Sequence, residues 1–436
     1  MNHLSLLSNK PLFWFRRDLR LKDNAGLYHA LRENNNVVPI FIFDTQILDR
    51  LEDKADARVE FILESLKVLQ QELLNVGSSL VVMHGDPVRL FQSIDTKLVY
   101  TNRDYEPYAI ARDEAVGKML VARGGRLVTS KDQVIFDRHE VVKPDGKPYT
   151  VFTPYSKTWK AKLSDFYVKS YPSERYLQKL AKMDEQTLPA LEDIGFVATG
   201  YKFPPRVIPR SIIVSYDKTR NFPAIQGTSR LGVHLRFGTV SIRQLVRLAL
   251  KQNGTWLNEL IWREFYQMIL FHFPYVQEHS FRVAYDRIRW RNNEEEFAAW
   301  CEGRTGYPLV DAGMRELNGT GYMHNRVRMV TASFLTKHLL IDLRWGEAYF
   351  ARKLLDYDLA SNNGGWQWAA GTGSDAAPYF RVFNPALQAK KFDPQFEYIR
   401  QWVPEYLSEG YPKPIVEHES ARVRAIGAFR IKNDEN

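Results

Sequence analysis

The densest group of reactive side chains lies in the segment TWLNELIWREFYQ. If this segment is a helix, Trp256, Glu259 and Arg263 share one face, and Trp262 and Tyr266 lie on a neighbouring face. A carboxylate and a guanidinium between indoles are costly to place in a core. An ion pair between Glu259 and Arg263 on an exposed helix would show the same spacing. The segment is therefore a candidate site with a plain structural alternative.

A second candidate is the segment MHNRVRM, in which Asn325, Arg328 and Met329 share one helical face. The asparagine amide both donates and accepts hydrogen bonds, as the edge of a heterocycle requires. Methionine adapts to a flat ligand. Arg326 and Arg328 could pair with phosphate or carboxylate groups. A capped helix start with exposed arginines would show the same pattern.

The third candidate, SNNGGWQW, joins a pair of glycines to Trp366 and Trp368. We expect Asn-Asn-Gly-Gly to break a helix and to let the backbone approach a ligand closely. Two indoles beside such a turn could stack on a flat ring system or on bases. A tryptophan buried under a glycine turn is the alternative.

A fourth candidate, QGTSRL, places Gly227 before Thr228 and Ser229. This pattern predicts a helix start whose free N–H groups and two hydroxyls could bind phosphate, and an ordinary cap is the alternative. Together the four candidates suit a large flat nucleotide cofactor and a nucleic-acid partner. We expect no metal site, because the histidines form no HExxH motif and His324 and His338 stand isolated.

Alternating strand and helix patterns fill the first part of the chain. This alternation predicts an α/β domain with a doubly wound parallel sheet over residues 1–130. The usual dinucleotide and P-loop motifs do not occur in it. Short apolar runs predict strands over residues 11–15, 37–43, 79–84, 97–102 and 125–130, and helical spacing marks 57–76 and 107–123.

The rest of the chain falls into two parts. Residues 131–210 are rich in proline and weakly periodic, so we expect a connector between domains. Residues 211–436 predict an all-helical domain with a loosely held charged tail after residue 419. Helices are expected over residues 240–250, 257–273, 294–301, 308–317, 325–340 and 346–355.

The composition narrows the class of protein. The 436 residues carry a net charge of +9, which is compatible with a nucleic-acid partner. The single cysteine, Cys301, excludes a disulfide framework. No long apolar run and no targeting segment are visible, so we expect a cytoplasmic protein without a membrane span. Eight of the ten tryptophans follow residue 255, a bias that burial alone does not demand.

At these motifs the sequence resembles the DNA photolyase and cryptochrome family. The match runs from FWFRRDLRLKDN through GTSRL, ELIWREFYQ, MHNRVRMVTASFLTK and DLASNNGGWQW to the tail, in order and in length register. The nearest subgroup is the class I cyclobutane pyrimidine dimer photolyases, in which four residues meet the dimer. Glu259, Trp262, Asn325 and Met329 match those four.

The resemblance implies a carbon–carbon lyase, a deoxyribodipyrimidine photo-lyase that binds FAD noncovalently in the helical domain. It would repair cyclobutane pyrimidine dimers in DNA by light-driven electron transfer from excited reduced FAD. Positions that match the family's flavin contacts are Tyr216, Thr228, Ser229, Arg230, Leu231, Trp256, Glu259, Arg263, Asn325, Arg328, Asp356, Asp358 and Asn362.

The resemblance also implies contacts with damaged DNA and a path for electrons. Trp366 and Trp368 would line the pocket of the flipped dimer with the four matched residues. Arg220, Arg326 and Arg381 would bind phosphates. Asn362 matches the asparagine beside flavin N5, and Trp290 and Trp366 match the outer and flavin-proximal members of the family's photoreduction chain. The expected catalytic residues are thus Glu259, Asn325, Asn362, Trp290 and Trp366.

The sequence departs from the family at three places. Leu343 stands where the middle tryptophan of the photoreduction chain is expected, and Trp345 lies about 200° further around a helix. Gly232 replaces a serine that would contact the FAD diphosphate. The folate-binding pattern is not matched around residues 105–112, which leaves the second chromophore open. The alternative function is a cryptochrome-like flavin photoreceptor without repair. In either case we expect a monomer.

Overall fold

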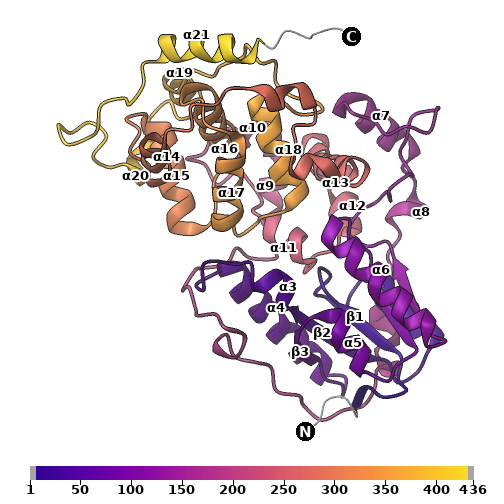
Figure 1. Cartoon of the computed structure of the whole chain (residues 1–436). Coiled ribbons are helices and arrows are strands. Elements are labelled where there is room, and N and C mark those ends of the chain that lie inside the picture. The colour runs from indigo at the N-terminus through magenta and orange to yellow at the C-terminus, as the bar shows by residue number, and fades with distance from the viewer. Residues whose placement is uncertain (1–5, 431–436) are drawn as a thin grey trace. The chain divides into compact units, whose positions relative to one another are not determined.

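The computed structural model describes residues 6–430, so residues 1–5 and the last part of the charged tail, 431–436, lie outside the described residues (Figure 1). The chain divides into two compact units. The first comprises Met1–Val141, Trp159–Val207 and Leu231–Lys251, and the second comprises Val142–Thr158, Ile208–Arg230 and Gln252–Asn436. The domain boundaries expected from the sequence stay predictions.

The first unit contains the five-stranded parallel sheet that the alternating pattern predicts. Its order is β3-β2-β1-β4-β5, and β1 pairs with both β2 and β4. Every residue of β1 and β2 is buried, which is why these strands are continuous apolar runs. The strands are β1 (Leu12–Phe15), β2 (Val38–Asp44), β3 (Val81–Gly85), β4 (Leu98–Asn102) and β5 (Arg126–Ser130).

The strand order reverses at β1, which confirms the doubly wound fold class. Right-handed crossovers then place α2 and α4 on one face of the sheet and α5 and α6 on the other. Figure 1 shows α5 and α6 packed side by side. The helices joined to the strands are α2 (Ala25–Glu33), α3 (Thr45–Leu48), α4 (Ala57–Leu74), α5 (Pro87–Ser93) and α6 (Pro107–Ala122), and α11 (Gly232–Phe237) and most of α12 (Ile242–Gln252) belong to the same unit.

Residues 131–210, expected as a connector, are only partly irregular. They contain two α-helices and two short 3-10 helices, which are α7 (Phe152–Lys162), α8 (Asp165–Val168), η1 (Ser173–Lys179) and η2 (Glu192–Ile194). The weak periodicity of this segment hid α7, because its buried faces carry Tyr155 and Trp159 rather than a regular aliphatic stripe.

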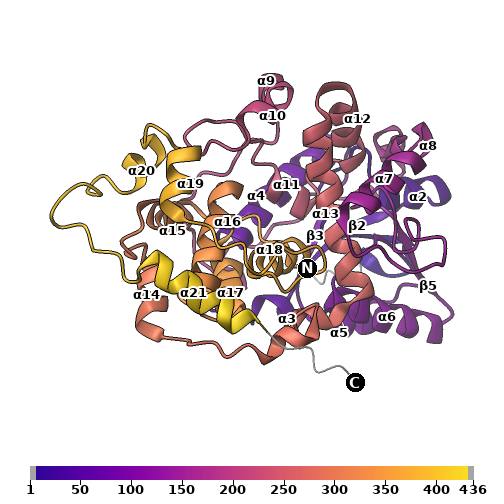
Figure 2. The same ribbon diagram turned by 90° about the horizontal axis from the view of Figure 1, so that it is seen from above.

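The second unit is helical, as expected, and α18 lies among α13, α16 and α17 (Figure 2). Its core gathers fully buried side chains such as Trp300, Met314 and Phe334. Its helices are α9 (Arg210–Val214), α10 (Tyr216–Thr219), α13 (Gly254–His272), α14 (Glu294–Glu302), α15 (Pro308–Thr320), α16 (Asn325–Ser333), α17 (Leu343–Lys353), α18 (Leu359–Ala370), α19 (Pro385–Phe392), α20 (Glu397–Trp402) and α21 (His418–Phe429). Two 3-10 helices, η3 (Pro274–Gln277) and η4 (Val283–Arg287), follow α13.

Two expectations about the helical unit are wrong. The tail after residue 419 is not loosely held up to residue 430, because α21 buries Ala421 and Phe429, and the Lys337 ammonium lies 3.1 Å from the centre of the Phe429 ring. His338 is not isolated either, since its Nε2 lies 2.8 Å from Nδ1 of His418. Both Lys337 and His338 belong to η5 (Phe334–His338), a π-helical turn that follows α16.

Among residues 6–430, no helix is long and apolar enough to cross a membrane. The same residues hold no group of three or more His, Cys, Asp or Glu side chains that could bind a metal ion.

Candidate active site

Helix α13 carries the first group of candidate residues. Its N-terminus is capped by Asn253, whose side chain accepts hydrogen bonds from the backbone of Thr255 and Trp256. Leu257, Leu260 and Phe265 anchor its apolar side in the core. The opposite side carries the residues that line a cavity, which are Glu259, Trp262, Arg263 and Tyr266.

Helix α16 presents the second group from the first turns of the helix. His324 caps the helix, because its Nδ1 accepts a hydrogen bond from the backbone N–H of Arg326. Burial and the nearby arginines lower the pKa of His324 to about 4, so the ring is neutral and able to accept. Asn325, Arg328 and Met329 line the same cavity as the α13 residues, as their shared face predicts.

Helix α18 contradicts the expected helix break, because it runs without interruption from Leu359 to Ala370. Its two glycines serve close packing instead. A Cβ on Gly364 would lie 2.1 Å from the ring of Tyr266, so only glycine lets α13 and α18 approach this closely. Gly365 lines the cavity beside Asn362 and Trp366. The expected helix end is therefore wrong, and the close approach that Gly364 allows is to another helix, so an approach of this backbone to a ligand stays a prediction.

The three helices, with Arg220 directly after α10 and residues on and after α17, enclose a cavity of about 380 Å³. Twelve of the residues predicted from the sequence line it, which are Arg220, Glu259, Trp262, Arg263, Asn325, Arg328, Met329, Asp356, Asp358, Asn362, Trp366 and Trp368. The cavity therefore joins flat aromatic walls to a small number of charged and amide groups, as sites for aromatic ligands do.

Two ion pairs set the charge of this cavity. Arg328 donates from Nη2 to both carboxylate oxygens of Asp356, at 2.9 and 3.1 Å. Burial acts to lower the pKa of Arg328, but the Asp356 carboxylate more than offsets it and the pKa is raised. Glu259 accepts a hydrogen bond from Nη1 of Arg220, and both Glu259 and Arg263 line the cavity rather than an exposed helix face.

Burial governs the electrostatics of Glu259. Burial raises its pKa, and the opposing effect of Arg220 is too small to cancel this rise. A raised pKa means that this carboxyl group takes up a proton more readily than an exposed one, and the protonated form can donate a hydrogen bond to a carbonyl oxygen. Such a group is what a ligand edge rich in carbonyls requires.

The amide of Asn362 has a fixed orientation. Its Nδ2 donates to the backbone carbonyl of Glu347 at 3.1 Å, and a carbonyl oxygen can only accept. The amide oxygen of Asn362 is thereby left for an N–H donor in the cavity. With Arg328 and Asp356, this acceptor fits a flat heterocycle that carries both N–H and carbonyl groups.

Trp262 is held from behind by a second aromatic ring. Phe152, at the start of α7, stacks on its indole with ring centres 3.7 Å apart and an interplanar angle of 4°. The backbone N–H of Phe152 in turn donates to Asp375 at 2.9 Å. This stack was not predicted, since nothing in the sequence links residue 152 to residue 262.

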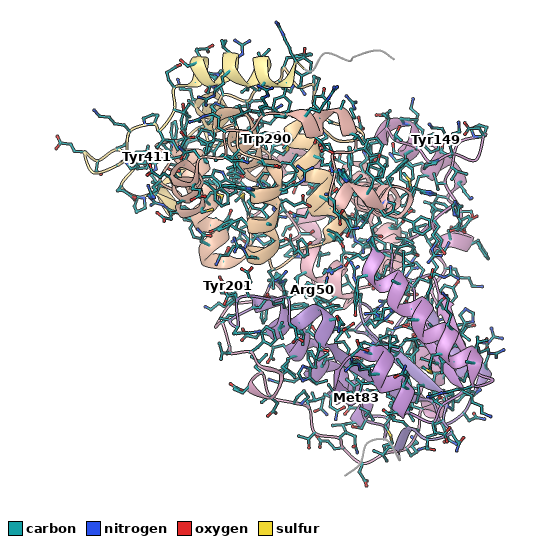
Figure 3. The ribbon with its side chains drawn as sticks, viewed as in Figure 1. Arg50, Met83, Tyr149, Tyr201, Trp290 and Tyr411 are labelled. Carbon is teal, nitrogen blue, oxygen red and sulfur yellow. The ribbon has the colours of Figure 1, made fainter. Side chains whose placement is uncertain are left out.

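The remaining predicted residues lie outside the cavity lining. Arg326 donates from Nη2 to Asn221 at 2.7 Å and covers the Phe392 ring, and Arg381 is exposed. Trp290, labelled in Figure 3, has its ring contact with Phe429 of α21. The other predicted residues that do not line the cavity are Tyr216, Thr228, Ser229, Arg230, Leu231 and Trp256.

The predicted phosphate turn takes a different form from the one expected. Helix α11 begins at Gly232 and its N-cap is Leu231, so neither Thr228 nor Ser229 caps it. Thr228 instead shares a hydrogen bond of 3.1 Å with the hydroxyl of Tyr322, whose ring also lies under Arg230. Arg230 has a φ of 51°, which turns the chain sharply at this point.

Sequence reasoning missed several residues of the cavity. The spacing of Trp262 and Tyr266 placed Tyr266 on the face of Trp262, but Tyr266 was given no role. Phe350 and Leu354 have the same spacing, on and just after a helix that no motif marked. The residues that line the cavity without having been assigned a role are Tyr266, Ala332, Phe350, Leu354, Tyr357, Ser361 and Gly365.

Both halves of the chain match known protein families. Residues 11–175 match the family described as DNA photolyase, and residues 256–409 match the FAD binding domain of DNA photolyase. A deoxyribodipyrimidine photo-lyase from Synechococcus is 40% identical to this chain over 93% of each sequence.

Solved structures agree with these matches. A bacterial class III photolyase from Agrobacterium tumefaciens superposes with a TM-score of 0.86 at 32% identity, and 97% of each chain is covered. An archaeal photolyase from Sulfolobus tokodaii, solved with two FAD molecules, gives a TM-score of 0.82 at 35% identity over 96% of this chain and 99% of that chain. The chain therefore belongs to the DNA photolyase family, as an enzyme whose helical unit carries the family's FAD-binding domain.

Proposed function

We propose that this enzyme repairs cyclobutane pyrimidine dimers in DNA with light, using FAD bound in the cavity between α13, α16 and α18. The observation that carries the proposal is the meeting of Glu259, Trp262, Asn325 and Met329 in one cavity with Asn362. Relatives named deoxyribodipyrimidine photo-lyase support the choice of substrate. Bound FAD, reduced and excited by light, supplies the electron that splits the dimer.

Asn362, Arg328 and Asp356 are the residues proposed to hold the flavin ring. The free amide oxygen of Asn362 would accept from a ring N–H, and its orientation is already set by Glu347. Arg328 and Asp356 offer a guanidinium and a carboxylate next to each other, which stabilises added negative charge without leaving an unpaired buried cation. The remaining flavin contacts proposed from the family are those given by the sequence, including Arg263 and Asp358 on the same cavity.

Glu259 and the aromatic walls are proposed to hold the dimer. The raised pKa of Glu259 favours its protonated form, which would donate a hydrogen bond to a base carbonyl, where negative charge grows when the dimer receives an electron. Trp262, backed by Phe152, gives the flipped bases a rigid flat surface, and Trp368 lies across the same cavity. Met329 adapts to the non-planar dimer.

Arginines around this cavity are proposed to bind the phosphates of the damaged strand. Arg220 lies in the cavity, Arg326 follows Asn325 on α16, and Arg381 is exposed in the loop after α18. Contacts of this kind release counterions, so the affinity for DNA should fall steeply as salt rises. An affinity that does not change with salt would contradict these assignments.

Loss of dimers from an irradiated oligonucleotide tests the proposal directly. The purified holoenzyme, its flavin reduced beforehand, should remove cyclobutane dimers under blue light and leave them untouched in the dark. A second oligonucleotide that carries a (6-4) photoproduct should remain unrepaired. Flavin binding without light-dependent repair of either lesion would support the photoreceptor function instead. The class I assignment stays a prediction, because a class III photolyase is among the structures most like this chain.

A further inference from the structure

We propose that Trp300 is the electron relay that connects Trp366 to the protein surface in this chain, with Trp345 as the terminal donor. The inference rests on the proposed function, since it requires the flavin to lie beside Trp366. It assigns two tryptophans that neither the motifs nor the comparisons mark. It also accounts for how the chain can do without an aromatic residue at position 343.

The structure has no aromatic ring at position 343, where the family's photoreduction chain has its middle tryptophan. Leu343 is buried, with 3% of its surface exposed, in the same core as Trp366. A saturated side chain has no high-lying filled orbital from which an electron can leave, so it cannot carry an electron hole. Trp290 does not close the gap, because its ring contact among the described residues is with Phe429, at 5.7 Å, and not with Trp366.

Trp300 does contact Trp366 directly. The two indoles meet edge to face with ring centres 6.1 Å apart, and Phe350 touches both, at 5.0 Å from Trp366 and 5.9 Å from Trp300. Trp300 lies on α14 and is fully buried. Because electron tunnelling weakens exponentially with distance, a ring in direct contact is the strongest candidate for the next transfer.

The position of the Trp366 indole is fixed by its packing. A Cβ on Gly346 would lie 2.1 Å from Cη2 of Trp366, so the indole rests directly on the backbone of α17. One edge of Trp366 therefore faces the cavity, and the ring also reaches Trp300. The absence of a side chain at Gly346 holds the donor between the cavity and the relay.

Within residues 6–430, neither indole N–H faces a base that could take its proton, so an oxidised indole passes on an electron hole instead of losing a proton. The N–H of Trp366 has no hydrogen-bond partner in the part of the chain that the structure describes. The N–H of Trp300 donates to the backbone carbonyl of Thr331 at 3.2 Å, and an amide carbonyl is too weak a base to take the proton. Each oxidised indole therefore stays a radical cation, which a neighbouring ring can reduce.

The Phe297 ring connects Trp300 to Trp345. Phe297 stacks on Trp300 with centres 5.9 Å apart, and Trp345 meets Phe297 edge to face at 5.2 Å. Trp345 is only partly buried. It lies on α17 but reaches the relay through α14, so its angular distance from position 343 on the α17 surface does not prevent the connection.

Tyr349 is a weaker terminal donor than Trp345, although its ring also contacts Trp300, at 5.8 Å. A phenol must lose its proton when it is oxidised, and the Tyr349 hydroxyl donates to Asn318 and to the carbonyl of Cys301, which are not bases. The Arg352 guanidinium also lies over its ring at 5.7 Å, where it opposes a second positive charge.

Each transfer along this route moves one electron. One electron leaves Trp366 for the photoexcited oxidised flavin, and Trp366 becomes a radical cation. Trp300 reduces Trp366, and Trp345 reduces Trp300. The hole ends on Trp345, whose indole N–H releases its proton to solvent. A thiol in solution returns one electron and one proton to Trp345 and is itself oxidised.

Transient absorption of the oxidised holoenzyme, with and without a thiol, tests the route. In Trp300→Phe the long-lived tryptophan radical should disappear, and flavin photoreduction under continuous blue light should slow at least tenfold. Trp345→Phe should shorten the lifetime of the radical in the same way. Repair by enzyme whose flavin has been reduced chemically should be unchanged in both variants, which separates electron relay from damage to the fold. Trp402→Phe, on α20, is the matched control and should behave as wild type.

The results that overturn the route are distinct from those that overturn the proposed function. A radical that is lost in Trp290→Phe and kept in both Trp300→Phe and Trp345→Phe would refute the relay. If Trp300→Phe does not bind flavin, Trp345→Phe and Phe297→Leu decide the question by radical lifetime alone. If Trp366→Phe is photoreduced as fast as wild type, the proposed placement of the flavin beside Trp366 is wrong.

Discussion

Each unit holds a carboxylate that is paired with arginine, but the number of arginines around the carboxylate differs between the two units. In the first unit Asp132 accepts hydrogen bonds from Nη2 of Arg20 and from Nη2 of Arg243, each at 2.7 Å. Arg243 also donates from Nε to Asp23 at 2.9 Å. Burial acts to raise the pKa of Asp132, but the two arginines lower it to about 2. The network has a partner for every charge and joins distant parts of the chain.

In the second unit Glu259 has a single guanidinium beside it, that of Arg220. Burial therefore dominates and raises its pKa. The comparison shows that a second guanidinium can offset burial, because the pKa of Asp132 is lowered beside two arginines and that of Glu259 is raised beside one. Sequence spacing does not show this difference, because the partners of both carboxylates lie far away in the chain.

The largest effect we predict is on the fully paired network. Asp132→Ala leaves Arg20 and Arg243 buried without their shared partner, and should cost the first unit about 3–5 kcal/mol of stability. Hydrogen exchange of the β1 and β2 amides, followed by mass spectrometry, measures this loss locally. Exchange within α18 of the second unit should change much less.

The control for Asp132 is an exposed ion pair of the same unit. Glu64→Ala removes the partner of Lys67 at the surface of α4, where both side chains are more than half exposed. This change should cost less than about 0.5 kcal/mol. Equal losses of stability in Asp132→Ala and Glu64→Ala would show that the ion pairs of the buried network do not stabilise the first unit.

The second prediction concerns the carboxylate with one partner. Glu259→Ala should slow dimer repair by about a hundredfold, because the hydrogen bond to the charged state of the substrate is lost. Glu259→Gln keeps an N–H donor and should lose less. FAD content and stability should remain close to wild type in both variants, the reverse of Asp132→Ala.

Single-turnover repair with the flavin reduced beforehand measures this effect. Glu294→Ala, which removes an exposed acid from the first turn of α14, is the matched control. If Glu259→Ala repairs at the wild-type rate, the direct contact with the dimer is disproved. If it loses FAD as well, the flavin contact that the family resemblance implies for Glu259 outweighs its contact with the dimer.

The sequence was most informative where local pattern decides structure. All five strands lie within two residues of their expected limits, and the fully buried strands β1 and β2 are the continuous apolar runs that a covered parallel sheet requires. The candidate cavity was also predictable, since Glu259, Asn325 and Asn362 each lie in a recognisable motif. In each case neighbouring residues along the chain carry the signal.

Long-range packing explains what the sequence did not predict. The glycines of α18 suggested a helix end, but Gly364 exists to admit the ring of Tyr266 from another helix. The tail after residue 419 looked polar, and yet Ala421 and Phe429 dock on the unit's core. The pairing of Glu259 with Arg220 and the stack of Phe152 on Trp262 link residues that are distant in the chain, so no periodicity encodes them.

The third prediction tests packing rather than charge at the same cavity. Gly346→Ala places a methyl group where Trp366 and Leu335 already lie, at 2.1 and 2.5 Å, so the indole must move. We expect a loss of about 1–3 kcal/mol in stability and a change in the flavin absorption bands. Gly427→Ala, on α21, meets no atom within 4 Å and should be neutral or slightly stabilising. A wild-type spectrum and stability in Gly346→Ala would contradict the fixed position of Trp366.

The smallest effect is a pH dependence that arises from His324, the neutral cap of α16. Its pKa is about 4 in the folded protein and about 6.5 in an unfolded chain, so the unfolded state binds more protons as pH falls below 7. Stability contributed by the neutral ring is therefore present above pH 6.5 and is lost as pH falls towards 4. Between pH 7 and pH 6 the loss should be less than about 1 kcal/mol.

His324→Asn removes the pH-dependent stability that comes from this ring, because asparagine keeps the helix cap but does not titrate. Urea denaturation at pH 7 and pH 6 should show a smaller drop in midpoint for His324→Asn than for wild type. His84→Asn, which removes an exposed imidazole from β3 of the first unit, should keep the full wild-type drop. An identical drop in His324→Asn and wild type would mean that the ring at residue 324 is not held neutral by burial and by its arginine neighbours. The helical unit would then owe its acid sensitivity to other groups, of which the buried pair of His338 and His418 is the next to test by the same substitution.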